Sequence, residues 1–145
     1  MEGTVQRIEV AAPPQQVYEV ALDLESYPEW AGGVKEVTIL EEDEHGRPHK
    51  AEFDVDAMIK EISYTLVYDY DHDSGFSWSA IPNEDLNALE GSYEFIELDD
   101  GNTEVVYALR VDPAFKVPGF LRRQAEKQIV GTALRGLKKR AEATS

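Results

Sequence analysis

Residues 49–60 read HKAEFDVDAMIK, a stretch in which apolar and charged side chains alternate. Because successive side chains of a strand point to opposite faces, this spacing predicts a strand with one buried and one solvated face. A sheet that is covered on one side only is typically antiparallel. The apolar positions of the stretch are Ala51, Phe53, Val55, Ala57 and Ile59.

Further strands are predicted on both sides of this stretch. Turn signals separate them: Glu41–Pro48 contains Gly46 and several charges, Asp71–Gly75 is polar, and Asp99–Asn102 carries an Asp-Gly pair typical of tight hairpins. Six strands in consecutive hairpins and one short strand near the N-terminus give seven. The predicted strands are Val5–Val10, Val34–Leu40, 49–60, Ile62–Tyr70, Phe76–Ala80, Leu86–Leu98 and Asn102–Asp112.

Two short helices are predicted between the first two strands. Pro13-Pro14 ends the first strand, since proline cannot donate to a sheet ladder but can open a helix. A second helix starts over Ser26–Trp30 and stops at Gly32-Gly33. The apolar residues of the first helix, at helical spacing, are Val17, Val20, Ala21 and Leu24.

A long amphipathic helix is predicted after Pro113 and Pro118, which end the sheet. Val130 and Leu134 widen its apolar stripe. We expect this helix to cover the sheet. The stripe steps by four residues through Leu121, Ala125, Ile129, Ala133, Leu137 and Ala141.

The composition is that of one folded domain, expected to cover residues 1–145. The net charge of −15 repels phosphate backbones, so we expect no nucleic acid partner. For the same reason we expect anionic membranes to be poor partners. The charge is uneven, however. Residues 118–145 hold seven Lys/Arg and two acids, which suits a basic helix lying across an acidic sheet.

The chain has no cysteine, which excludes disulfides, thiolate nucleophiles and sulfur-ligated metals. Its first ten residues, MEGTVQRIEV, lack the apolar core of a signal peptide, and no run of 18 apolar residues occurs. We therefore expect no integral membrane segment and a cytoplasmic location.

The element order, with several local motifs, resembles the polyketide cyclase/dehydrase and lipid transport family of the START-related helix-grip superfamily. The resemblance implies an α+β fold in which a strongly curved seven-stranded antiparallel sheet wraps round the C-terminal helix, leaving a deep cavity. Members of the family use the cavity for lipids, sterols, quinone-like molecules or hormones, and some guide the cyclisation of polyketide chains. The motifs are APPQQVY (12–18), DLESYPEW (23–30), Tyr68-x-Tyr70, Trp78, GSY (91–93) and VPGFL (117–121).

Catalytic or metal-binding groups do not converge in the sequence. His45, His49 and His72 fall at predicted hairpin edges, where a solvated role is expected. Glu90 is a candidate buried acid only if a bulge near Gly91 turns it inward. No hydrolase, dinucleotide, nucleotide or zinc-protease motif occurs, so we assign no catalytic residue, no metal and no cofactor.

Aromatic side chains on adjacent strands are the informative feature, because they either fill a core or wall a pocket. We expect a hydrophobic small-molecule ligand in that pocket, with Tyr hydroxyls available to form hydrogen bonds with it. Phe115, Phe120 and Leu121 are expected at the mouth of the pocket. Two alternatives stay open: an aromatase/cyclase-like enzyme, and a protein interaction module without a ligand. The predicted ligand-binding residues are Trp30, Phe53, Val55, Tyr64, Leu66, Tyr68, Trp78, Tyr93, Tyr107, Phe115, Phe120 and Leu121.

Overall fold

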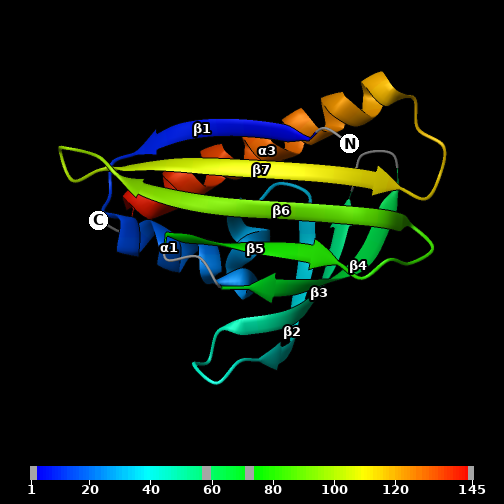
Figure 1. Cartoon of the computed structure of the whole chain (residues 1–145), viewed down its shortest axis with the longest axis horizontal. Coiled ribbons are helices and arrows are strands. Elements are labelled where there is room, and N and C mark those ends of the chain that lie inside the picture. Colours follow the sequence, from blue (N-terminus) through cyan, green and yellow to red (C-terminus); the bar gives the residue numbers. More distant parts are fainter. Residues whose placement is uncertain (1–2, 57–59, 71–73, 144–145) are drawn as a thin grey trace.

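The computed structural model describes residues 3–56, 60–70 and 74–143. One seven-stranded antiparallel sheet has the order β1-β7-β6-β5-β4-β3-β2 (Figure 1). The first and last strands of the chain thus pair, β1 with β7, while the other strands follow as hairpins. The strands are β1 (Thr4–Val10), β2 (Val34–Glu42), β3 (Pro48–Asp56), β4 (Glu61–Asp69), β5 (Gly75–Ala80), β6 (Leu86–Glu97) and β7 (Thr103–Pro113).

These bounds confirm the strand pattern predicted from the alternation. Ala57 and Ile59, and the turn at 71–73 with His72, lie outside the described residues. The Asp-Gly hairpin between β6 and β7 is closed by Gly101, whose φ of +85° favours glycine. Side chains from alternate positions of each strand therefore share the concave face of the sheet.

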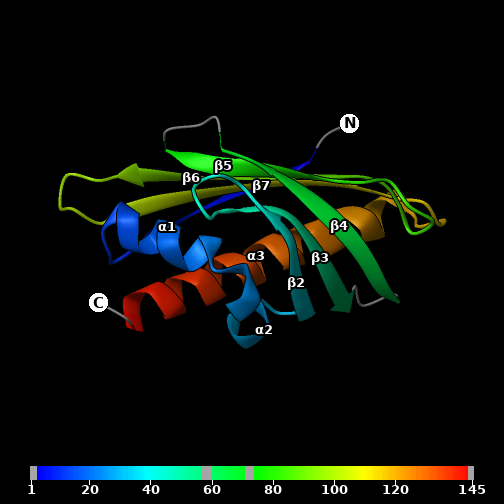
Figure 2. The ribbon, with the colours of Figure 1, turned by 90° about the horizontal axis from the view of Figure 1, so that it is seen from below.

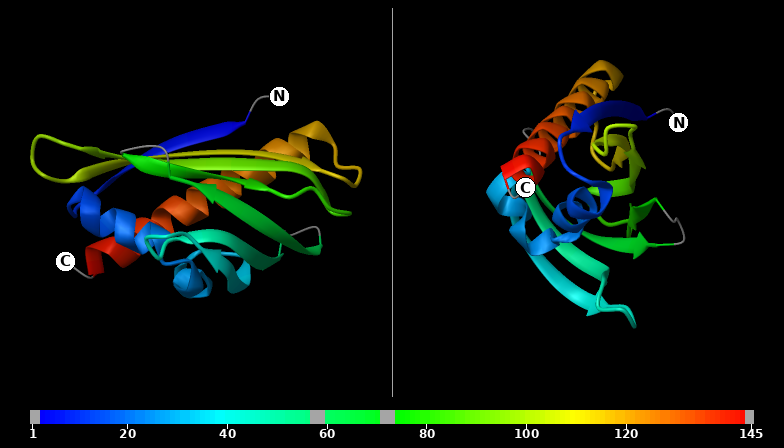
Figure 3. Two further views of the ribbon diagram at one scale, coloured as in Figure 1. Left: turned by 60° about the horizontal axis from the view of Figure 1, so that its bottom comes forward. Right: turned by 90° about the vertical axis from the view of Figure 1, so that its left-hand side faces the viewer.

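Helices cover that concave face. The sheet curls from β1 round to β2, and α3 (Gly119–Ala143) runs along its hollow with α1 (Pro14–Leu22) and α2 (Tyr27–Trp30) beside it (Figures 2 and 3). A single 3₁₀ turn, η1 (Leu24–Ser26), joins the two short helices. The predicted α+β helix-grip arrangement is confirmed.

Fully buried side chains gather where α1 meets the C-terminal half of α3. Val17, Ala21, Leu137 and Ala141 all have 0% exposed surface, as does Val10 at the end of β1. Gln16 Nε2 also donates to the Ala141 carbonyl at 2.8 Å. This end of the molecule is a closed, filled core.

The predicted stripe of α3 is wrong at its N-terminal end. Leu121 and Ile129 are 41% and 38% exposed, whereas Glu126 is buried; Val130, predicted to widen the stripe, is buried as expected. The reason is geometric: each four-residue step turns about 40° further round a helix, so five steps drift by about 200°. A strict four-residue stripe therefore cannot face the sheet over the whole length of α3.

Candidate functional site

A cavity of about 320 Å³ lies between the concave face of the sheet and α3. Its floor and walls come from β3, β4, β6 and β7, with Trp78 of β5 at the centre. The segment from α2 to the start of β2 closes one side, and α3 covers the top. Eight aromatic side chains contribute to the lining: Tyr27, Trp30, Phe53, Tyr64, Tyr68, Trp78, Tyr93 and Tyr107.

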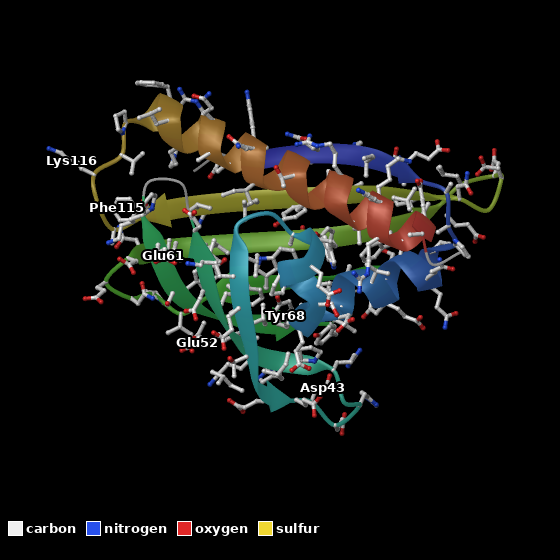
Figure 4. All side chains as sticks on the ribbon, turned by 180° about the vertical axis from the view of Figure 1, so that it is seen from behind. Asp43, Glu52, Glu61, Tyr68, Phe115 and Lys116 are labelled. Carbon is white, nitrogen blue, oxygen red and sulfur yellow. The ribbon has the colours of Figure 1, made fainter. Side chains whose placement is uncertain are left out.

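The predicted site residues divide into two groups. Phe115 is half-buried beside Lys60, whose Nζ lies 5.1 Å from the ring centroid. Phe120 and Leu121 are 63% and 41% exposed at the start of α3. None of these three lines the cavity, and Figure 4 shows Phe115 on the loop after β7, apart from Tyr68. The nine that line it are Trp30, Phe53, Val55, Tyr64, Leu66, Tyr68, Trp78, Tyr93 and Tyr107.

Other lining residues were missed from the sequence. Three of them, Leu89, Leu109 and Val111, share the inward phase of β6 and β7. The alternation of side chains along these strands could therefore have identified them. Tyr27 also lines the space, and its ring lies 4.7 Å from that of Trp30. The remaining ones depend on how α3 and the α2–β2 segment dock, which no local pattern specifies. They are Ala31, Gly32, Gly33, Val34, Gln128, Ile129, Thr132 and Ala133, whereas Asp56 ends β3 and Ile62 has the inward phase of β4.

The cavity opens to solvent where its lining residues are also exposed. Gly32 and Gly33 form one side of this rim, and Gln128 and Ile129 of α3 form the other. A Cβ on Gly32 would lie 2.5 Å from Thr132 Cγ2, so glycine permits the segment to approach α3 closely. The mouth therefore opens between α3 and the α2–β2 segment.

Trp78 lies flat over the backbone of the neighbouring strand. Gly91 is its direct partner in the β5–β6 register, and a Cβ there would come within 2.4 Å of the indole. The ring is held among Tyr93, Tyr107 and Tyr68, with centroid separations of 5.4, 5.7 and 5.9 Å. Gly91 thus keeps Trp78 against the wall, which leaves the middle of the hollow open.

Trp30 is positioned by a second glycine. A Cβ on Gly136 of α3 would lie 2.2 Å from the Trp30 carbonyl oxygen. The indole Nε1 is buried and has no hydrogen-bond partner among the residues that the structure describes. Both tryptophans of the chain therefore border the cavity.

Four tyrosine hydroxyls supply most of the polarity of the cavity wall. Those of Tyr64, Tyr68, Tyr93 and Tyr107 make no hydrogen bond within the described part of the chain, whereas Tyr27 donates to the Ala21 carbonyl. Burial raises the pKa of each of the four above its ordinary value of 10.0. They are therefore neutral groups that donate or accept hydrogen bonds, and weaker acids than a free tyrosine.

Glu90 does not point into the cavity. It lies opposite Arg110 in a regular register, and the Arg110 guanidinium donates to its carboxylate at 3.2 Å on the outer face. The register shift of β6 falls between Leu86 and Ala88, so the bulge considered near Gly91 is absent from this pairing. Arg110 therefore faces outward, and Glu90 is no buried acid.

Other titratable candidates are also outside the cavity. His45 and His49 are exposed, as predicted, and His72 lies outside the described residues. Within 3–56, 60–70 and 74–143, no group of three His, Cys, Asp or Glu is placed to hold a metal ion. In the same ranges, no helix is both long and apolar enough to span a membrane.

Comparison with known proteins agrees with this architecture. The model of the polyketide cyclase/dehydrase and lipid transport family matches residues 10–138. A START superfamily protein from Mycobacterium smegmatis superposes with a TM-score of 0.92 at 20% identity, each chain being covered completely. The Zhui aromatase/cyclase from Streptomyces sp. R1128 gives 0.79 at 20% identity, covering 97% of this chain and 93% of its own.

A protein from Thermus thermophilus gives a TM-score of 0.80 at 22% identity, with 99% of both chains covered. No curated protein matches the sequence. Similarity at these identities establishes the helix-grip fold, and the family match extends over most of the length. The chain belongs to the polyketide cyclase/dehydrase and lipid transport family.

Proposed function

We propose that the protein binds a small hydrophobic molecule, lipid-, quinone- or polyketide-like, in the cavity between the sheet and α3. The observation that carries this proposal is a space of about 320 Å³ enclosed by aromatic rings. Protein interiors are normally packed as densely as organic crystals, and ligand pockets start at about 300 Å³. Aromatic rings that served only as core would be expected to close such a space.

The chemistry of the lining narrows the class of ligand. Apolar and aromatic walls favour a flat or chain-like apolar body. The four tyrosine hydroxyls that lack partners among the described residues, with Gln128 and Thr132 on α3, offer hydrogen bonds to a few oxygen atoms. A ligand with one or two carbonyl or hydroxyl groups on an apolar skeleton satisfies both requirements. The nine predicted residues that line the space are the proposed contacts.

Displacement of a neutral fluorescent probe, N-phenylnaphthylamine, tests the proposal. Lipids, quinones, sterols and aromatic polyketides are added to the probe complex, and melting temperatures are measured in parallel. A ligand at 100-fold excess over its dissociation constant contributes about 2.7 kcal/mol, which raises the melting temperature by roughly 6–12 °C. A panel that neither displaces the probe nor raises the melting temperature contradicts the binding function.

Matched variants localise the binding. Tyr64→Trp places extra volume in the cavity and should abolish probe binding, whereas Leu40→Trp changes a side chain that is 49% exposed on β2 and outside the lining. Loss of binding in both variants, or in neither, would place the probe elsewhere. Circular dichroism of each variant verifies that the fold is retained.

An aromatase/cyclase-like enzyme is the second candidate, favoured by hydroxyl donors that face the same space. Asp56, at the rim, is the only carboxylate of the lining among the described residues. Proton transfer would therefore fall to tyrosines whose pKa values are raised by burial. Products of a reactive poly-β-ketone that change with Tyr64→Phe or Tyr107→Phe would favour the enzyme, and products unaffected by the protein would favour binding alone. An interaction module would be expected to have a collapsed cavity.

A further inference from the structure

A second hollow lies between β1 and the first half of α3, and it shares no residue with the cavity. Its volume is about 510 Å³. We call it the basic groove, because three of its residues are basic and none of the described ones is acidic. It is lined by Gly3, Thr4, Val5, Gln6, Arg122, Arg123 and Lys127.

The acidic residue nearest to these in the sequence is buried and does not line the groove. Glu126 is 1% exposed, accepts a hydrogen bond from the Val111 backbone N–H at 2.8 Å and lies 3.3 Å from Thr4 Oγ1. Arg123 and Lys127 are exposed and form no ion pair with another described residue. At these two positions the groove therefore presents positive charge without an ion-pair partner in the described part of the chain.

Two large apolar side chains are exposed at this end of the molecule: Val5 lines the groove, and Phe120 lies two residues before Arg122 on α3. Phe120 is 63% exposed and Val5 is 60% exposed, the two highest values among the large hydrophobic residues that the structure describes. Phe120, Arg123 and Lys127 follow the spacing i, i+3, i+7, which brings them to one face of α3. This end of the helix rises clear of the strands (Figures 1 and 3). Apolar and basic groups thus share one projecting surface.

The net charge of −15 does not cancel this surface. Charges more than about 8 Å apart are largely screened at physiological ionic strength. Strand acids that lie further than this from Arg123 and Lys127 therefore weaken the potential of these two residues little. The expectation that anionic membranes are poor partners came from the whole-chain charge, which ignores this separation.

We propose that this end of the molecule docks on an anionic lipid surface. Phe120 and Leu121 enter the boundary between headgroups and acyl chains, while Arg123 and Lys127 contact the headgroups. Basic residues alone would equally suit an acidic protein or nucleic acid, but exposed apolar side chains among them are typical of interfacial helices. Ile129, on the rim of the cavity, lies about two turns after Leu121 on α3.

Vesicle flotation tests the docking. Wild-type protein should bind phosphatidylcholine vesicles that contain phosphatidylglycerol, bind pure phosphatidylcholine much more weakly, and release with added salt. The double variant Arg123→Glu/Lys127→Glu should weaken vesicle binding at least about 25-fold, because each lost cation lowers the membrane affinity about fivefold. Phe120→Ala should weaken it about tenfold through lost apolar burial.

The control is Arg135→Glu/Lys139→Glu, which makes the same charge change at exposed positions further along α3. It should keep most of the binding. Equal loss in both double variants, equal binding to neutral vesicles, or no binding at all overturns the proposal. Binding of N-phenylnaphthylamine in solution, measured on the same variants, should be unchanged, so failure of the docking and failure of the cavity function are distinguishable.

Discussion

The two halves of α3 carry similar apolar side chains but meet different surroundings. In the C-terminal half, Leu134, Leu137 and Ala141 are at most 2% exposed because α1 fills the concave side of the sheet there. In the N-terminal half, Ile129 borders the cavity and Leu121 is exposed. The difference teaches that one amphipathic helix can close a core along its C-terminal turns and leave a binding space beside its middle turns, where Gln128, Ile129, Thr132 and Ala133 line the cavity.

Aromatic side chains follow the same division. At the closed end, the Tyr18 ring lies edge-on to Phe76 and Phe95, with centroid separations of 5.6 Å for both pairs. At the open end, Tyr64 and Tyr107 face the cavity with hydroxyls that lack partners among the described residues. The first set is expected to govern stability, and the second set ligand affinity.

High pH should give the largest effect and should act through the open half. Since burial raises the pKa of Tyr64, Tyr68, Tyr93 and Tyr107 above 10.0, the folded protein keeps these protons at pH values where the unfolded chain loses them. The contribution of these tyrosines to stability is therefore constant below about pH 9 and falls above about pH 10, by about 1.4 kcal/mol per pH unit for each of them. Urea unfolding measured at stepwise higher pH checks this. Tyrosinate absorbance from more than three of the seven tyrosines in the folded protein near pH 10 would contradict it.

Large-to-small substitutions compare the halves directly. Leu137→Ala, at 0% exposure in the closed end, should lower the free energy of unfolding by about 2–5 kcal/mol and leave probe affinity unchanged. Ile129→Ala, at 38% exposure on the cavity rim, should cost less than about 1 kcal/mol and change probe affinity instead. Chemical denaturation and probe titration measure the two quantities. Equal stability losses would mean that the halves do not differ as described.

Gly91→Ala tests how the open half is kept open. The new Cβ would lie 2.4 Å from the Trp78 indole, so the ring must move into the cavity, at a cost of about 1–3 kcal/mol. Probe affinity should fall and tryptophan emission should shift. Gly119→Ala is the control, because its Cβ would meet only Arg123 Nη1 at 3.5 Å. Unchanged probe binding in Gly91→Ala would show that the position of Trp78 does not determine the volume of the cavity.

Glu126→Leu examines how the open half of α3 is held to the sheet. The substitution leaves the Val111 N–H without its acceptor and should cost about 1–3 kcal/mol. Glu126→Gln retains an acceptor oxygen and should cost less. Hydrogen exchange should report faster exchange for the first turns of α3 than for its C-terminal half in Glu126→Leu. Uniform acceleration along the helix would contradict a local tether.

The sequence predicted the sheet well because period-two alternation and hairpin turns are local signals. It also predicted the cavity walls, since Phe53, Tyr64 and Tyr107 each occupy the inward phase of a strand. It failed for Phe120 and Leu121, whose exposure depends on where α3 leaves the sheet. Helix docking and loop approach are set by contacts between distant segments, which no local period encodes.

The most direct test of the cavity function is a fluorescence titration of the Trp30→Phe variant. Trp78, at the centre of the lining, is then the only tryptophan. A hydrophobic ligand that raises the melting temperature should also change Trp78 emission saturably, with the same dissociation constant by both measurements. A rise in melting temperature without any change in Trp78 emission would place the ligand outside the cavity and contradict the account.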